Sequence, residues 1–242
     1  MGRVMDLETV LTYGTVIVYP LAFIPAMLYA SVRSRKNSFF DTEANPLDRY
    51  RYKSMSFGTT ALLVSITTLA LGVVIDPISQ LLPEMSSDLE AAMERLLNAP
   101  LWLSILSVSI FAPIFEEWLC RGMILRGLLA RTKPVIAILV SGLIFGLIHG
   151  NIWQAIPATL IGAFFGYVYW KTGSLKLTML MHCVNNTMAL IVSRIDALKD
   201  LDNYMDMFPD TWAWLIFYVA CLNIVILCIY KFQRKDQIPE NN

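Results

Sequence analysis

Ionisable side chains occur within segments of the sequence that are otherwise apolar. Glu116 and Glu117 directly follow a long uncharged stretch, and Arg121 comes four residues later. The chain has two histidines, His149 and His182, and both lie in stretches without Asp, Glu, Lys or Arg. Because an ionisable group is costly to place inside a membrane, such residues are candidates for function.

This set of side chains could hydrolyse an amide bond. A carboxylate and a histidine in a dry pocket can together activate a water molecule as the nucleophile. His182 and Asn186 lie one helical turn apart and share a face, where both can donate hydrogen bonds to a developing oxyanion. Since no Ser or Cys stands in a recognisable nucleophile motif, the predicted reaction has no covalent intermediate.

The same residues also permit a metal mechanism. Glu116, His149 and His182 would form a zinc set of two histidines and one carboxylate, with water as the fourth ligand. The H-E-x-x-H spacing is absent from the sequence, so three separate helices would have to contribute to such a site. On these residues alone, the metal-free and the zinc mechanism both stay open.

Helical spacing indicates which of these side chains face one another. Residues four apart share a helix face, so we expect Glu117 to pair with Arg121 and Phe145 to lie beside His149. Glu116 points about 100° away from its neighbour and is available to another partner. The pair with Arg121 could be purely structural, and a histidine or an amide inside a membrane could simply hold helices together.

Six stretches without charged residues provide the elements that would carry these groups. They are Thr9–Val32, Ser54–Ile75, Leu96–Phe115, Pro134–Trp170, Leu177–Ser193 and Thr211–Tyr230. A bilayer core needs about 20 apolar residues per helix, and the fourth stretch is long enough for two helices that meet near Gly150–Asn151. The prediction is an all-α, polytopic membrane bundle of about seven transmembrane helices, with residues 1–242 in one integral membrane domain.

Counting along the predicted helices places the polar groups at similar depths. With a rise of about 1.5 Å per residue, Glu116 and His149 each lie about 22 Å from the cytoplasmic end of their helix. On the same count, His182 and Asn186 lie about 12 and 18 Å into theirs. We therefore expect these four residues to converge around one cavity within the membrane.

Composition and charge indicate the partners and the orientation. Apolar residues make up 56% of the chain and charged residues 16%, against about 45–50% and about 25% in a soluble domain. The net charge of zero argues against a nucleic-acid partner, and the expected partner is the lipid bilayer. The distribution of Lys and Arg between loops predicts an N-terminus outside and a C-terminus in the cytoplasm. The acidic loop between residues 76 and 98 is expected to carry a surface helix with a capping box at Ser87.

Three sequence motifs contain the candidate residues in a fixed order. Glu116–Arg121 fits E-E-x-x-x-R, Phe145–His149 fits F-x-x-x-H and His182–Asn186 fits H-x-x-x-N. On three successive membrane segments, this set resembles the CPBP family of CAAX proteases and bacteriocin-processing enzymes, also called the Abi family. The resemblance covers about Leu101–Ile195, so residues 101–195 would be the catalytic core.

The resemblance implies an intramembrane endopeptidase similar to CAAX prenyl protease 2. By analogy with the family, Glu116 and His149 would activate the water. His182 and Asn186 would stabilise the oxyanion. The substrate would be a protein or a peptide, either soluble or anchored in the membrane. The short chain resembles a bacterial member, which predicts a place in the bacterial inner (plasma) membrane.

The resemblance also implies supporting positions and a choice of cofactor. Glu117, Arg121 and Phe145 would hold the site together. The family has been described both as metalloproteases and as metal-free glutamate proteases. We favour no cofactor, because Glu116 can serve as a base without a metal, and we keep zinc as the alternative.

Two other classes of function are alternatives to proteolysis. A non-catalytic membrane scaffold or a bacteriocin-immunity protein would tolerate Glu116→Gln, because the bundle would still fold. A small transporter or channel would use the polar cluster to pass an ion or a solute, but the sequence contains no internal repeat that would favour it. A peptidase, by contrast, requires Glu116 and both histidines.

Overall fold

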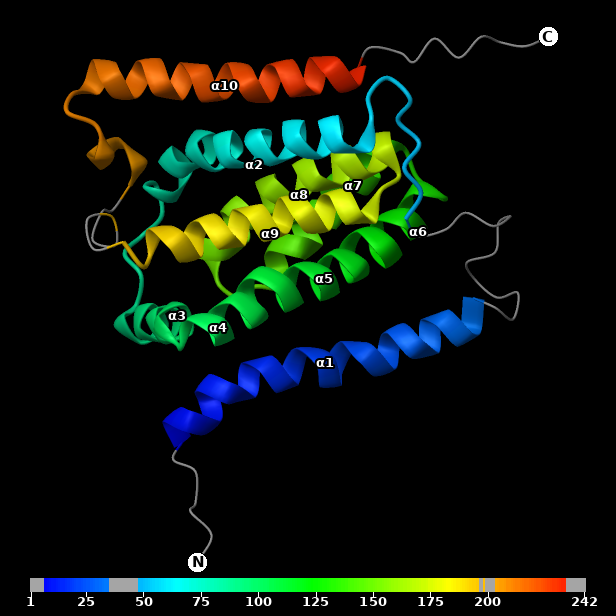
Figure 1. The fold of residues 1–242 in the computed structure, drawn as a ribbon, viewed down its shortest axis with the longest axis horizontal. Coiled ribbons are helices and arrows are strands. Elements are labelled where there is room, and N and C mark those ends of the chain that lie inside the picture. Colours follow the sequence, from blue (N-terminus) through cyan, green and yellow to red (C-terminus); the bar gives the residue numbers. More distant parts are fainter. Residues whose placement is uncertain (1–6, 35–47, 196–197, 199–202, 234–242) are drawn as a thin grey trace, which may run out of the picture.

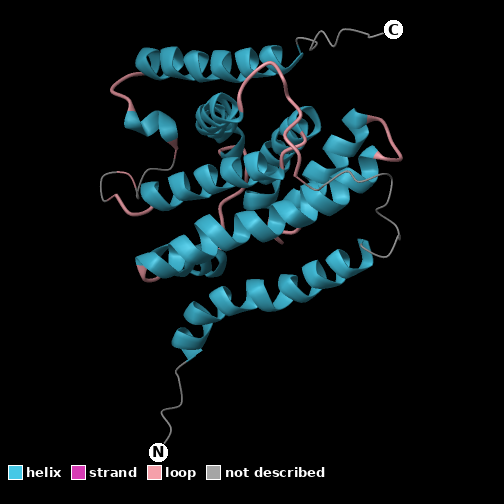
Figure 2. Ribbon diagram, turned by 45° about the vertical axis from the view of Figure 1, so that its right-hand side comes forward, coloured by secondary structure: helices cyan, strands magenta, loops and turns pink. Residues whose placement is uncertain are grey.

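The computed structural model describes residues 7–34, 48–195, 198 and 203–233. Within these residues every regular element is a helix, which confirms the all-α prediction (Figure 2). The elements are α1 (Leu7–Ser34), α2 (Phe57–Ser79), α3 (Ser87–Asn98), α4 (Leu101–Ser104), the π-helix η1 (Ile105–Phe111), α5 (Ala112–Glu117), the π-helix η2 (Trp118–Leu125), α6 (Arg126–Leu129), α7 (Pro134–Leu147), α8 (Ile152–Thr172), α9 (Leu175–Val192), the 3-10 helix η3 (Tyr204–Met207) and α10 (Thr211–Gln233).

Five helices in the described residues are long and apolar enough to cross a membrane. They are α2, the continuous helix Leu101–Leu129 formed by α4 to α6, α8, α9 and α10. The other two predicted segments are also helical, but their apolar parts are shorter. Helix α7 has 14 residues, which gives it a length of about 21 Å, less than the bilayer core of about 30 Å. In α1 the apolar part is Pro20–Ala30.

The long apolar stretch from Pro134 divides into two helices where it was expected to. Gly150 has a φ of +72°, a left-handed conformation that favours glycine. Asn151 then caps α8, because its side-chain oxygen accepts a hydrogen bond from the backbone N–H of Gln154 at 2.9 Å. The turn ends α7 after 14 residues and reverses the chain.

Helices α7 and α8 pack closely along small residues. A Cβ atom at Gly142 would lie 2.8 Å from the backbone nitrogen of Ala163 and 2.9 Å from the carbonyl oxygen of Thr159. Only glycine therefore allows the two backbones to approach this far, as small residues do in other membrane helix pairs.

Helix α9 lies in the middle of the bundle and contacts η1, α5, α8 and α2. Helix α2 separates it from α10 at one edge of the molecule, and α1 lies along the opposite edge (Figure 1). Phe23 of α1 stacks on Phe115 of α5, with ring centroids 5.3 Å apart. Helix α9 is therefore enclosed by other helices, whereas α7 keeps exposed apolar side chains such as Leu139 and Leu143.

The predicted surface helix is present as α3, but its predicted capping box is not. The N-cap is Ser86 rather than Ser87, and its side chain makes no capping hydrogen bond. The backbone N–H groups of Leu89 and Glu90 instead bond to the carbonyl oxygen of Ser86. Backbone bonds of this kind complete the first turn without the side-chain exchange that the sequence indicated.

Candidate active site

A cavity of about 510 Å³ lies between α3, the third membrane helix, α7, α8 and α9. Its lining contains seven polar side chains, those of Ser107, Glu116, His149, Gln154, His182, Asn185 and Asn186. The structure therefore brings together all four residues that the sequence analysis proposed for chemistry, although they come from three separate motifs. The other lining residues are mainly apolar.

His149 is oriented by the helix that carries it. Its Nδ1 lies 2.8 Å from the carbonyl oxygen of Phe145, one turn earlier in the chain. A carbonyl oxygen can only accept, so Nδ1 carries the hydrogen, and Nε2 of the neutral ring keeps its lone pair. The spacing F-x-x-x-H thus places a backbone acceptor under the imidazole and leaves the other nitrogen able to accept a proton.

The ring of Phe145 contacts both histidines. It packs edge-on against His149 at a centroid distance of 5.2 Å and against His182 at 5.3 Å. Phe145 is 2% exposed, so its ring has little freedom to move. The ring of Phe145 therefore lies between the two imidazoles and restricts their orientation, as expected for a residue that supports the site.

Behind the cavity, Glu117 accepts two side-chain hydrogen bonds on one oxygen. Arg121 donates from Nη1 to Glu117 Oε1 at 2.8 Å, which is the ion pair that helical spacing predicted. His182 Nδ1 lies 3.2 Å from the same oxygen. An ionised carboxylate only accepts, so Nδ1 of His182 donates. The buried negative charge of Glu117 is thus stabilised by the positive charge of Arg121 and by the hydrogen bond from His182.

Arg121 is completely buried and is held by three further contacts. Its Nη2 donates to the carbonyl oxygen of Gly162 at 2.6 Å, and its guanidinium lies over the rings of Phe145 and Phe165 at 4.5 and 5.6 Å. A Cβ at Gly162 would meet the Phe145 ring at 2.8 Å and Arg121 Nη2 at 3.1 Å. The absence of a side chain at Gly162 therefore makes room for the arginine.

Asn186 is fixed by contacts on both ends of its amide. Its Nδ2 donates to the carbonyl oxygen of Val108 at 2.9 Å, and its Oδ1 accepts from Asn185 Nδ2 at 3.2 Å. A primary amide has two N–H donors. One N–H therefore remains for another acceptor at the edge of the cavity, and its direction is set by the first.

The carbonyl of Val108 is available because of a proline and a π-helix. In an α-helix it would accept from Ala112, but the N–H of Ala112 bonds to the carbonyl of Ser107 in π-helical geometry. The π-type partner of Val108 would be Pro113, which has no N–H. Sequence reasoning missed this arrangement, although Pro113 inside an expected helix was a usable signal.

The second π-helix follows the two glutamates. In η2, the carbonyl oxygen of Cys120 accepts a hydrogen bond from Ser141 Oγ of α7 at 3.0 Å. The segment that carries Glu116 and Glu117 thus lies between two π-helices, each with a carbonyl bonded to a side chain of another helix. Such bulges recur at functional sites because they re-aim the residues beside them.

A metal site was one of the two predicted alternatives. Within the described residues, no group of three or more His, Cys, Asp or Glu side chains is arranged so that it could hold a metal ion. The mechanism below therefore uses no step through a metal. The metal-free mechanism and the zinc alternative of Glu116, His149 and His182 both stay predictions.

The four cysteines are free thiols and lie outside the lining of the cavity. Cys183 follows His182 in the chain, but its sulfur lies 3.9 Å from the hydroxyl of Thr187, on another face of α9. Neighbours along a helix point in different directions. None of these thiols is placed to act as a nucleophile in the cavity.

A family model described as type II CAAX prenyl endopeptidase Rce1-like matches residues 98–188. The matched segment contains the three motifs and the helices that bring their side chains together. Over this segment, which is less than half of the chain, the protein is similar to the CPBP family that its motifs resemble. With five apolar helices long enough to span a bilayer among its described residues, the protein is an integral membrane protein.

Two relatives from Bacillus subtilis (strain 168) show similarity to this chain. "Putative membrane peptidase YdiL" is 28% identical over 121 residues, which cover 50% of this chain and 47% of that protein. "Uncharacterized protein YyaK" is 24% identical over 238 residues, which cover 92% of this chain and 75% of that protein. The match to the first relative thus spans about half the length of either protein. No solved structure matches the chain.

Proposed function

We propose that this protein is an intramembrane endopeptidase of the CPBP type that hydrolyses a peptide bond without a covalent intermediate. The observation that carries the proposal is the single cavity into which Glu116, His149, His182 and Asn186 converge. The family match and the relative named as a membrane peptidase support the same reaction class.

In the first step, Glu116 and His149 activate a water molecule. Glu116 is only 8% exposed, and His149 has Nδ1 bonded to its own backbone, which leaves Nε2 as a proton acceptor. One of the two groups takes a proton from the water, and the oxygen of the water forms a bond to the carbonyl carbon. The carbonyl π electrons move to the oxygen and give a tetrahedral oxyanion.

His182 and Asn186 stabilise this oxyanion. Asn186 supplies the N–H that remains after its bond to Val108. His182 already donates Nδ1–H to Glu117, so it donates from Nε2 when the ring is doubly protonated. Because Glu117 is paired with Arg121, the negative oxyanion itself offsets the charge of the imidazolium. Each oxyanion donor of this kind contributes about 10²–10³ in rate.

The intermediate then collapses with cleavage of the C–N bond. The proton taken from the water is returned to the leaving nitrogen, which departs as an amine. The other product is a carboxylic acid that carries the oxygen of the water. The balance is one water consumed for each peptide bond, and every proton transfer uses groups that line the cavity.

The test compares protein termini across the membrane proteome of cells with wild type or Glu116→Gln. Glu94→Gln on exposed α3 serves as the matched control, because it makes the same chemical change outside the cavity lining. We expect specific new termini in wild type and in Glu94→Gln that disappear in Glu116→Gln. Identical termini in all three strains at matched expression would contradict proteolysis and favour the scaffold or immunity alternative.

A further inference from the structure

The cavity around Glu116 has a closed end and an open end. At the closed end, Glu116, Phe165 and His182 are buried, with exposed fractions of 8%, 0% and 4%. At the other end, Met93 and Trp153 are half-buried and the lining is more exposed. Burial therefore decreases along the cavity from the motif residues toward α3 and the first turn of α8.

The elements at the open end are suited to a water-facing surface. Helix α3 has three acidic residues and one arginine in twelve positions, a composition that does not enter the hydrocarbon core. Met93 of α3 lines the cavity. The indole Nε1 of Trp153 donates to the carbonyl oxygen of Pro83 at 2.7 Å, which ties α8 to the loop before α3. The entrance is therefore framed by segments at the membrane surface.

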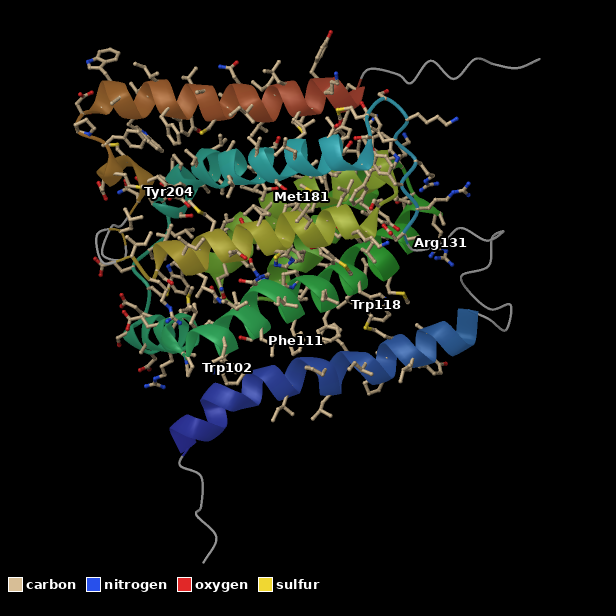
Figure 3. All side chains as sticks on the ribbon, viewed as in Figure 1. Trp102, Phe111, Trp118, Arg131, Met181 and Tyr204 are labelled. Carbon is tan, nitrogen blue, oxygen red and sulfur yellow. The ribbon has the colours of Figure 1, made fainter. Side chains whose placement is uncertain are left out.

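Basic residues gather at the opposite ends of the helices. They lie in the segment before α2, in the turns α6–α7 and α8–α9, and in the last turn of α10. Figure 3 shows Arg131 at this end and Tyr204 at the other, on the same side of the bundle as α3. Within the described residues, Arg95 and Arg194 are the only basic ones on the α3 side. Cytoplasmic loops carry the excess of Lys and Arg, so the α3 side faces away from the cytoplasm.

We propose that the cavity opens at the extracytoplasmic surface beside α3, and that its substrate is a polypeptide segment presented there. This inference rests on the proposed peptidase function and narrows its substrate class. The substrates are exported polypeptides or membrane proteins with a cleavable segment near the outer surface. A segment that ends in the cytoplasm lies on the wrong side of the closed end to reach Glu116.

Single cysteines in a Cys183→Ala background test the side of the entrance. The three remaining thiols are buried, and the parent variant measures their reactivity. The positions are Met93→Cys at the entrance, Ser107→Cys inside the cavity and Lys133→Cys at the basic end. Ala189→Cys, at another lining position, replaces Ser107→Cys should that variant not accumulate. The probe is a small, charged, membrane-impermeant methanethiosulfonate, applied to spheroplasts and to inside-out vesicles.

We expect Met93→Cys and Ser107→Cys to react on spheroplasts, and Lys133→Cys to react only on inside-out vesicles. Reaction of Met93→Cys from the cytoplasmic side, or from neither side, would overturn the proposal. Reaction of Met93→Cys but of neither cavity position would show that this surface does not lead to the site, and would also overturn it. Labelling does not depend on turnover, so a failure of the peptidase proposal would leave these results readable.

Discussion

The third membrane helix and α10 show opposite relations between composition and burial. An 18-residue apolar window of Leu101–Leu129 has a mean hydropathy of 1.5, and 61% of that window is buried. The corresponding window of α10 has a mean hydropathy of 2.4, and 22% of it is buried. In water the more apolar helix would be the more buried one. Lipid tails are as apolar as Leu, so in a bilayer the most apolar helix can face outward.

The two helices also differ in the partners of their side chains. The third helix contains Glu116, Glu117 and Arg121. Helix α8 provides an acceptor for Arg121 and α9 a donor for Glu117. Helix α10 packs mainly against α2 and presents apolar side chains such as Ile216, which is 73% exposed. The inner helix is thus specified by paired polar groups, and the outer one by hydropathy.

The largest effects are expected from the two histidines of the cavity. Removal of a general base costs about 10²–10⁴ in rate, and removal of an oxyanion donor about 10²–10³. We therefore expect His149→Ala and His182→Ala to abolish detectable cleavage, while both proteins stay folded in the membrane. The measurement is the rate of product formation by purified variants in proteoliposomes. Retained activity in either variant would remove that histidine from the mechanism.

Loss of the buried positive charge on the third membrane helix should destabilise the protein much more than loss of an exposed one on α10. Arg121→Met leaves the carboxylate of Glu117 buried without its ion-pair partner, which costs about 3–5 kcal/mol when such a pair is broken. Lys231→Met removes the same charge from an exposed position of α10 and should change stability by no more than about 0.5 kcal/mol. Denaturant unfolding in detergent micelles compares them. Equal effects would contradict the view that paired charges specify the inner helix.

A smaller effect is expected from the proline that frees a carbonyl for Asn186. Pro113→Ala supplies an N–H that can compete for the Val108 oxygen. Loss of one ordinary hydrogen bond is worth about 0.5–1.5 kcal/mol, so kcat should fall a few-fold to about tenfold with KM unchanged. Pro77→Ala in α2 is the control, because it changes a helix proline outside the cavity lining. An equal change of kcat in both variants would contradict the proposed effect of Pro113 on the Asn186 amide.

The smallest effect concerns a contact outside the membrane segments. Burial alone would raise the pKa of Asp48, but hydrogen bonds from Ser174 and Lys176 outweigh it and leave the pKa below its usual value of 3.8. The stabilisation is thus complete above pH 3.8 and is lost as pH falls through the lowered folded pKa. We expect Asp48→Asn to remove this part of the acid sensitivity. Unfolding curves of the two proteins from neutral to acidic pH should therefore diverge above pH 3.8 and converge below the folded pKa.

Much of the bundle and of the site followed from the sequence. Uncharged stretches located the helices, and the turn at Gly150–Asn151 was placed correctly. Spacing of four predicted the pair of Glu117 with Arg121, because the helical repeat fixes which side chains are neighbours. Convergence of the motifs in one cavity was also expected, since depth along a helix depends only on residue count and rise.

The remaining features depend on contacts between segments far apart in the chain. The bond from Asn186 to Val108 requires α9 to lie beside η1. The contact of Met93 with the cavity requires α3 to fold back over α8. Hydrophobic periodicity reports the face of a helix but not which neighbour covers it. The capping box failed for a related reason, because backbone acceptors completed the first turn of α3.

The most direct test of the account is the rate at which purified Glu116→Gln protein cleaves a substrate identified from the comparison of termini. Glu94→Gln is assayed beside it, and unfolding of both variants is measured in the same detergent. We predict a loss of about 10²–10⁴ in rate for Glu116→Gln, with stability close to that of wild type and full activity in Glu94→Gln. Cleavage by Glu116→Gln at the wild-type rate would contradict the claim that this buried carboxylate activates the water.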